Sequence, residues 1–487
     1  LKAKLLPLLR REVRWRRIVF EKPILRLVKG RDGAWNLLEG LPNLPSEDTS
    51  KEPFLPVVST LFGGSIAFRE GEISILDQSL PAEPLLTMIR SFNLQISEIA
   101  YGKAFPLRVN GKVVQPKGEG SFSVEATLRD IPEDLDWTKG KIEAEVKTQG
   151  LELPHFWPYF RKWFPVKNFS GTLDLDAHYE GEARGTFKTS GKIKFKDVLF
   201  DHPQVFSYVL TPKWVNVGFD LRYDRQTFEA LQFSIELPEI AVRGKGRVYG
   251  IGTNQMGMEA EAQSATFDLS DGKRFIPFRI LHNRDLADHL FRSEGKGPVQ
   301  ILRVRLAGKI PEIEHCDQLR YAHTLSVEMK IHKILLKLPW DFPVLRDLKG
   351  HLSFRNGHLH FKDLDGGFLH STLTRANGTF FELLQESTLQ VEGEGKLDLT
   401  DLPEVKKSGI LSREIEEVLQ PIHFVSGHLQ CRVSARGALK PPFRFEHQGT
   451  YTFSMARFNH AQIPMAISVI EGTMTFSNQG LQWSQTK

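Results

Sequence analysis

Cysteine is scarce in this sequence, which has only Cys316 and Cys431 among its 487 residues. Two cysteines build neither a disulfide framework nor a four-cysteine zinc site, and a low count suits an oxidising compartment. The sequence leaves open whether the two form a single bridge. Long apolar runs are missing too, and no window comes near the run of about 18 apolar residues that a membrane-spanning helix needs. Because the chain begins at Leu1 rather than Met and ends at Lys487 directly after an alternating apolar stretch, we expect a fragment of a longer protein, with any signal or anchor upstream.

Catalytic and nucleotide-binding motifs are also missing. Gly191-Lys192 lacks the upstream glycine of a phosphate-binding loop, and the string Gly244–Gly250 has the wrong spacing for a dinucleotide fingerprint. Neither an HExxH zinc pair nor a GxSxG nucleophile elbow occurs. We therefore expect a protein that is not an enzyme and that binds no cofactor or metal.

Two residue clusters deserve a test against this expectation. Basic side chains share the strand face of most of a histidine cluster and would repel a metal cation; the cluster is His351, His358, His360 and His370. Two aspartate pairs could serve metal-assisted chemistry, but strand alternation alone produces such pairs, so solvated strand positions are favoured. These pairs are Asp174 with Asp176 and Asp363 with Asp365.

Positive charge is concentrated at one end. Residues 1–31 contain eleven basic and two acidic side chains, a net charge of +9, so a total of +5 leaves −4 for the remainder. Such an end suits anionic lipid headgroups, at about 1 kcal/mol per basic residue. Arg14, Arg16 and Arg17 are the predicted membrane-proximal side chains. A solvated strand face is the alternative, and nucleic acid is disfavoured because the acidic remainder would repel it.

Alternation of apolar and polar residues dominates the rest of the chain, as in Phe122–Leu128, Leu173–Tyr179, Val215–Tyr223 and Val327–Ile331. This period of two is typical of half-buried strands in antiparallel sheets. An open sheet rarely exceeds about 10 strands without curling. About 25 strands at roughly 4.8 Å spacing would extend about 120 Å. The predicted fold is therefore mainly β, an elongated, curled antiparallel sheet forming a repeating groove, with a few short helices.

Helical and linker signals are few. A helical pattern with a serine start and a proline stop covers 408–420, and a second short helix is predicted at 283–292. The prolines and polar residues of 39–56 are typical of a linker. The predicted organisation is an N-terminal segment at 1–41, a linker at 42–56, a β-groove at 57–407, a short helix at 408–423 and a further β-groove repeat at 424–487.

A hairpin-like pattern recurs three times, starting at Gly64, Gly350 and Gly472. In the second copy, a two-residue turn at Asn356-Gly357 would pair Phe354 with Leu359 and place the apolar residues on one face. Unrelated hairpins that obey ordinary strand rules are the alternative to a true repeat. The three apolar sets are the candidate groove residues: Ile66, Phe68, Ile73 and Ile75; Leu352, Phe354, Leu359 and Phe361; Met474, Phe476, Leu481 and Trp483.

Aromatic residues crowd the stretch 155–164, where Arg161 and Lys162 stand among them. Aromatic and basic residues in this mixture suit a membrane interface or a plug over an apolar groove. A short helix that packs on one end of a sheet is an equally favoured interpretation.

Several segments resemble the bacterial AsmA-like family. The resemblance includes residues 5–38, with Asp-Gly-x-Trp-Asn at Asp32–Asn36, and also 148–160, 170–195 and 366–380. The family includes TamB- and YhdP-type proteins and is similar to eukaryotic chorein-type bridge-like lipid transfer proteins. The resemblance implies an inner-membrane-anchored, periplasm-facing protein whose apolar β-groove conducts phospholipid acyl chains between the inner and outer membranes.

Three functional classes follow from these observations. The first is a lipid conduit, whose partners are phospholipids, a membrane surface and envelope proteins. The second is an envelope scaffold or outer-membrane assembly factor with a closed β core. The third is a β-rich hydrolase or transferase, which the missing motifs disfavour. An open apolar trough would separate the first class from the second.

Overall fold

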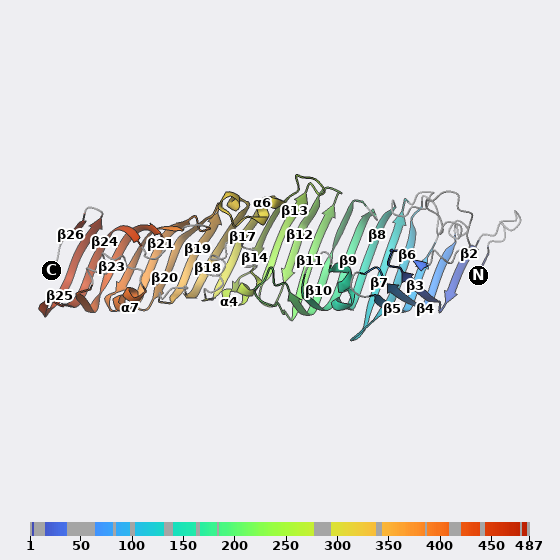
Figure 1. Cartoon of the computed structure of the whole chain (residues 1–487), viewed down its shortest axis with the longest axis horizontal. Coiled ribbons are helices and arrows are strands. Elements are labelled where there is room, and N and C mark those ends of the chain that lie inside the picture. Colours follow the sequence, from blue (N-terminus) through green and yellow to red (C-terminus); the bar gives the residue numbers. More distant parts are fainter. Residues whose placement is uncertain are drawn as a thin grey trace. The chain divides into compact units, whose positions relative to one another are not determined.

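A computed structural model gives the architecture of the chain (Figure 1). It describes residues 2–3, 15–36, 64–80, 84–97, 103–130, 140–161, 166–182, 185–276, 294–337, 343–384, 387–408, 420–438, 444–477 and 480–484. Strands account for 70% and helices for 10% of the structure, so the prediction of a mainly β, curled antiparallel sheet with few short helices is confirmed. The predicted linker, the predicted helix at 283–292 and residues 409–419 of the helix predicted at 408–420 lie outside the described residues.

The chain divides into two compact units. Unit 1 comprises Leu1–Pro203, Val209–Pro238 and Lys245–Asn254, and unit 2 comprises Gln204–Tyr208, Glu239–Gly244 and Gln255–Lys487. One strand, β13 (Ala241–Tyr249), has residues in both units.

Unit 1 is a row of neighbouring strands. From β4 to β12 each strand pairs antiparallel with the next one in the chain. The elements are β1 (Lys2–Ala3), β2 (Trp15–Glu21), β3 (Ile24–Lys29), β4 (Ser65–Asp77), β5 (Leu85–Ile96), β6 (Phe105–Gln115), β7 (Gly118–Arg129), β8 (Lys141–Glu152), α3 (Leu153–Phe160), β9 (Asn168–Glu182), β10 (Phe187–Asp201), β11 (Trp214–Tyr223) and β12 (Phe228–Glu236).

Unit 2 repeats this plan, with short helices at the strand ends. In Figure 1, α4 and α7 lie at one end of its strands and α6 lies at the other end. Its elements are β14 (Gly257–Ser264), β15 (Phe267–Asp268), α4 (Leu269–Gly272), η3 (Lys273–Phe275), β16 (Glu294–Lys296), β17 (Pro298–Lys309), α6 (Ile310–Glu314), η5 (Leu319–Thr324), β18 (Leu325–Lys337), β19 (Leu345–Arg355), β20 (His358–Phe368), β21 (Ser371–Phe381), β22 (Thr388–Asp398), η6 (Leu399–Asp401), α7 (Leu402–Lys407), β23 (Ile422–Ala438), β24 (Arg444–His460), β25 (Ile463–Ser477) and β26 (Gly480–Ser484).

The hairpin at Asn356-Gly357 forms as predicted. Phe354 pairs with Leu359 and Leu352 with Phe361. Both turn residues have positive φ, 51° at Asn356 and 80° at Gly357, which a two-residue hairpin turn of this kind requires. The third copy is also a hairpin, in which Phe476 pairs with Leu481 and Met474 with Trp483.

The first predicted hairpin is wrong, because residues 65–77 continue as one strand, β4. Phe68 pairs with Leu94 and Ile73 with Ile89, both on β5. Of the turn residues only Glu70 has positive φ, at 51°. A single left-handed residue shifts the register as a β-bulge, whereas the two-residue turn needs two.

An exception to antiparallel pairing occurs at β4. The consecutive strands β2 and β3 both pair with β4 in parallel, with Phe20 opposite Phe68 and Leu27 opposite Ile75. Lys22, between them, has φ 49°, and its amide donates to the Arg69 carbonyl oxygen at 2.8 Å. The break in β2–β3 therefore matches the bulge in β4.

A short motif recurs at the ends of three strands. An aspartate accepts hydrogen bonds from both the amide and the hydroxyl of a serine or threonine two residues later, at 2.9–3.0 Å and 2.6 Å. In two of the three cases the aspartate caps a following helical turn. The motifs are Asp77 with Ser79, Asp268 with Ser270 and Asp398 with Thr400.

Candidate functional site

The apolar face of unit 1 is a continuous surface that extends from β6 to β12. Cross-strand pairing aligns its side chains in rows across the strands. One row is Val109, Val124, Val146, Ala177, Gly191, Phe219 and Phe233, and the next is Gly111, Phe122, Thr148, Leu175, Ile193, Val217 and Ile235. Of these fourteen residues, Gly111 alone is buried. We use the name apolar trough for these two rows of residues.

Helix α3 crosses several strands of unit 1 and contacts residues outside the two rows of the apolar trough. The Trp157 ring meets the Phe169 ring on β9 at 5.2 Å, while the His155 Nε2 atom lies 3.1 Å from the Thr87 Oγ1 atom on β5. Strands β6, β7 and β8 lie between these two contacts, so the helix crosses the face instead of following one strand. The prediction of a short helix at the end of a sheet thus holds for the described part of this stretch, and Trp163 and Phe164 lie outside the described residues.

Neutral side chains attach α3 to the sheet. Burial lowers the pKa of His155 against the opposing effect of Glu152, and burial raises the pKa of Tyr159, which is also hydrogen-bonded to Asp77. Both groups are therefore uncharged at neutral pH, which reduces the cost of placing them against apolar side chains.

A polar network holds the chain segment that leads into α3. The Gln115 side chain donates to the Gly150 carbonyl at 3.0 Å and accepts from the Glu152 amide at 2.5 Å. The buried Glu152 carboxylate accepts from the Lys117 amide at 2.7 Å. These bonds satisfy buried polar groups, so the position of α3 is specified by backbone as well as by aromatic packing.

The predicted groove residues of β4 lie together on one face of unit 1. Ile66, Phe68 and Ile75 are half-buried, while Ile73 is buried. The Phe68 ring stacks on the Phe20 ring with centroids 4.8 Å apart. This set therefore continues the apolar surface, although it forms no hairpin.

The predicted groove residues of the second hairpin share one face of unit 2. Phe354 and Leu359 are half-buried. Phe361 is only 7% exposed and contacts the Phe380 ring at 5.6 Å, and Leu352 packs against the core cluster Val299, Ile331, Ile334 and Leu348. Part of this face is thus covered by packed side chains of the same unit.

In the third hairpin, Met474 is half-buried and pairs with Tyr451 on the same face of unit 2. The side chains of Phe476, Leu481 and Trp483 lie outside the described residues.

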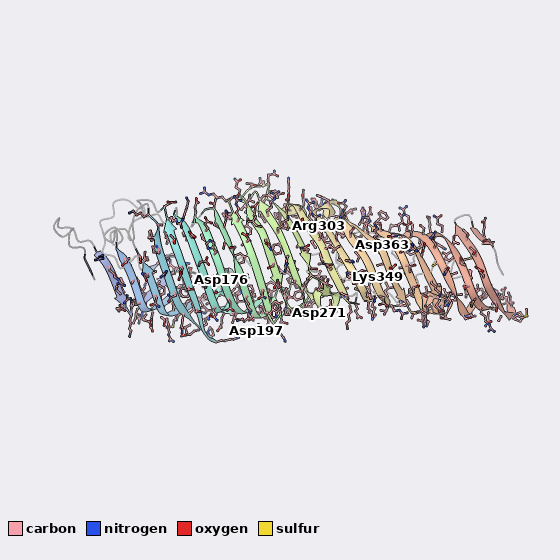
Figure 2. All side chains as sticks on the ribbon, turned by 180° about the vertical axis from the view of Figure 1, so that it is seen from behind. Asp176, Asp197, Asp271, Arg303, Lys349 and Asp363 are labelled. Atoms are coloured by element: carbon pink, nitrogen blue, oxygen red, sulfur yellow. The ribbon has the colours of Figure 1, made fainter. Side chains whose placement is uncertain are left out.

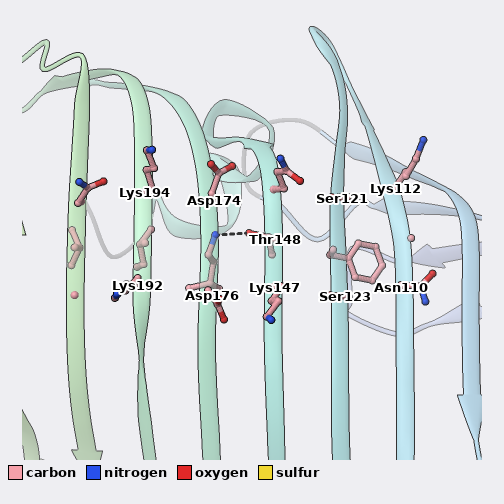
Figure 3. A pocket seen from close by; sticks show the side chains of 18 of the residues that line it. Asn110, Lys112, Ser121, Ser123, Lys147, Thr148, Asp174, Asp176, Lys192 and Lys194 are labelled. Carbon is pink, nitrogen blue, oxygen red and sulfur yellow. Dashed lines mark hydrogen bonds between the residues drawn. The ribbon is translucent and has the colours of Figure 1, made fainter.

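The opposite face is polar. Figure 2 shows charged side chains over the polar face of each unit, among them Asp176 in unit 1 and Arg303, Lys349 and Asp363 in unit 2. In unit 1 a hollow of about 1020 Å³ crosses β5 to β12, where small polar residues such as Ser121 and Ser123 lie between longer charged ones (Figure 3). Its lining also includes Phe122, Leu175, Ile193 and Val217 of the apolar rows. The two faces therefore differ sharply in chemistry.

One aspartate of each pair considered for catalysis, Asp174 and Asp365, is an ionised structural group. Burial acts to raise the pKa of Asp174, but hydrogen bonds from Lys196 at 2.9 Å and the Gly150 amide at 2.8 Å outweigh it, and the pKa is lowered. The Arg375 amide and Lys349 likewise lower the pKa of Asp365. Carboxylates held in this way are poor proton donors at neutral pH.

The described residues contain neither a cluster of metal ligands nor a membrane-spanning helix. Across the described ranges, no three His, Cys, Asp or Glu side chains gather as a metal site would require. No helix in the same ranges has the length and apolar character to cross a bilayer. Both cysteines are free thiols. Of the clustered histidines, His351, His360 and His370 are exposed.

The basic N-terminal residues lie at the β2 side of unit 1. Arg16 and Arg17 are exposed on β2, while Arg14 lies outside the described residues. Apolar side chains nearby are exposed as well, including Ile24, which is 71% exposed, and Phe20. Basic and apolar side chains exposed together suit a membrane surface.

The Asp-Gly-x-Trp-Asn motif forms a turn that folds back on β3. The Ala34 amide donates to the Asp32 carboxylate at 3.0 Å, and Gly33 has φ 86°. The Asn36 amide group then accepts from the Val28 amide at 2.9 Å and donates to the Arg26 carbonyl at 3.0 Å. The Asn36 side chain thus forms hydrogen bonds with backbone groups of β3 in the place where a neighbouring strand would form them.

A comparison with protein families finds a match to the family described as YhdP protein, over residues 121–487. This match covers well over half of the chain. The chain belongs to the YhdP family. It is a TamB/AsmA-type family, so the AsmA-like resemblance is confirmed. The family indicates a bacterial envelope protein of lipid-transport type. No curated protein and no solved structure matches the chain.

Proposed function

We propose that the apolar trough conducts phospholipid acyl chains between the inner and outer membranes. The observation that carries this proposal is the pair of rows across β6–β12, apolar except at Thr148, whose side chains remain in part open to solvent. A closed envelope scaffold would cover such a face with a second layer of protein. An apolar face that stays exposed instead marks a binding surface.

Energetics favour acyl chains as the cargo. Burying a methylene group stabilises by about 0.8 kcal/mol, so a chain of about 16 carbons gains roughly 13 kcal/mol when it leaves water. Neighbouring positions in a row, such as Leu175, Ile193 and Val217, present similar side chains at each strand. A chain can therefore move from one strand to the next with little change in free energy and with no chemical step.

The N-terminal side of unit 1 is the proposed membrane-proximal part. Exposed Arg16 and Arg17 lie on the same strand as exposed Phe20, a combination that suits an anionic headgroup region. We place the protein in the periplasm, anchored to the inner membrane.

A photocrosslinking experiment tests the conduit. A photoreactive amino acid at Phe219 faces the apolar trough, and the same amino acid at Asp220 on β11 faces the opposite side and is the control. We expect lipid adducts at 219 and far fewer at 220, with co-purified phospholipid seen by native mass spectrometry. Equal labelling at both positions, or the absence of lipid adducts from a folded protein, would favour the scaffold.

A further inference from the structure

A small pocket on the polar face of unit 2 concentrates arginine side chains. It has a volume of about 240 Å³ and is lined by residues of β17, η5, β18 and β19 and of the turn after β19. Figure 2 labels Arg303 on this face. We call it the arginine pocket, and its lining includes Arg303, Arg305, His323, Ser326, Glu328, Arg355 and Asn356.

Strand register places two of these arginines on either side of a hydroxyl. Arg305 on β17 lies opposite Ser326 on β18, and Ser326 lies opposite Arg355 on β19. Adjacent strands are about 4.8 Å apart, so each guanidinium can reach a ligand that sits above Ser326. The Ser326 hydroxyl would donate to that ligand from below.

The ion pairs around this pocket leave one arginine side chain unpaired. Arg303 binds Glu261 at 2.9 Å, and Arg355 is paired with Glu328. Glu261 is also opposite Arg305 in register, but its carboxylate contacts Arg303. Among the residues that the structure describes, Arg305 has no ion-pair partner. Three guanidinium groups therefore face two carboxylates.

We propose that the arginine pocket binds a phosphate group, either free or carried by a lipid headgroup. Planar guanidinium groups bind phosphate oxygens with paired hydrogen bonds. An anion above Ser326 would contact Arg305 and Arg355 together and relieve the repulsion between them. The pocket lies on the face opposite the apolar side chains, so this site is independent of acyl-chain conduction.

The test uses the whole chain and two probes. Inorganic phosphate is titrated by calorimetry, and vesicles of phosphatidylcholine with or without phosphatidylglycerol are tested by co-sedimentation at low salt. Arg305→Gln removes the unpaired charge, and Arg436→Gln, at an exposed position of the same face on β23, is the matched control. Unchanged thermal melts of both variants establish that they fold.

We expect Arg305→Gln to weaken phosphate binding by about tenfold or more, because charge-assisted hydrogen bonds are lost, while Arg436→Gln binds like the parent chain. Binding of inorganic phosphate identifies free phosphate as a sufficient ligand. Arg305-dependent binding to phosphatidylglycerol vesicles alone identifies the lipid headgroup. Binding that is unaffected by Arg305→Gln, or no binding to either probe, overturns the proposal.

Discussion

An acidic residue in the apolar trough should separate an open surface from a closed core. Ile193 is half-buried between Leu175 and Val217. Full burial of such a side chain stabilises by about 1.5–3 kcal/mol, and each cross-strand pair adds about 0.2–1 kcal/mol. Ile193→Asp should therefore cost about 2 kcal/mol, because the new carboxylate can still reach water.

The comparison variant is Ile331→Asp in unit 2. Ile331 is 3% exposed and lies in a core cluster with Ile334 and Leu348. Loss of the large side chain costs about 2–5 kcal/mol, and burial of an unpaired carboxylate adds several more. We expect this variant to lose its folded structure, whereas Ile193→Asp stays folded.

Urea denaturation of both variants and lipid photocrosslinking at position 219 supply the measurements. Ile193→Asp should keep most of its stability and lose most of its lipid adducts, because a charged group interrupts the apolar row. If Ile193→Asp is as unstable as Ile331→Asp, then another layer covers the face and the reasoning fails. Undiminished lipid labelling in a folded Ile193→Asp protein would refute it equally.

Three further outcomes are expected. Gly357→Ala should destabilise by about 1–3 kcal/mol, because φ is 80° and a Cβ atom would lie 2.7 Å from a Leu319 methyl group; Gly252→Ala, with φ 81° and no atom within 4 Å, should cost less in the same urea assay, and equal costs would contradict the packing argument. Asp398→Ala should cost about 1 kcal/mol at neutral pH. Hydrogen bonds from Thr400 lower the pKa of Asp398 below its ordinary 3.8. The stability that Asp398 contributes is therefore present above pH 3.8 and disappears as pH falls through the lowered pKa of the folded state. A cost of Asp398→Ala that stays constant across urea melts at several pH values would contradict this pH dependence. Arg16→Glu with Arg17→Glu should weaken co-sedimentation with anionic vesicles, and added salt should weaken the parent chain likewise; indifference to both would leave a solvated strand face.

Local patterns predicted the mainly β structure and the assignment of residues to faces. Alternation predicts which side chains share a face, because successive residues of a strand point to opposite sides. The Asn356-Gly357 turn also predicts its own register, since both residues tolerate positive φ. The same pattern at Glu70-Gly71 failed, because its second position does not adopt positive φ and both halves of β4 pair with other strands.

The functional surfaces depend on pairings that the sequence does not encode locally. Three features join segments far apart in the chain: the rows of the apolar trough, the contacts of α3 with β5 and β9, and the placement of Arg305 and Arg355 on either side of Ser326. The period of two determines a side chain's face but not which strand lies beside it. By itself, then, the sequence determined a β-rich protein with one apolar and one polar face. Only the tertiary structure decided which side chains became neighbours on each face, because strand order and register arise from the packing of the whole sheet.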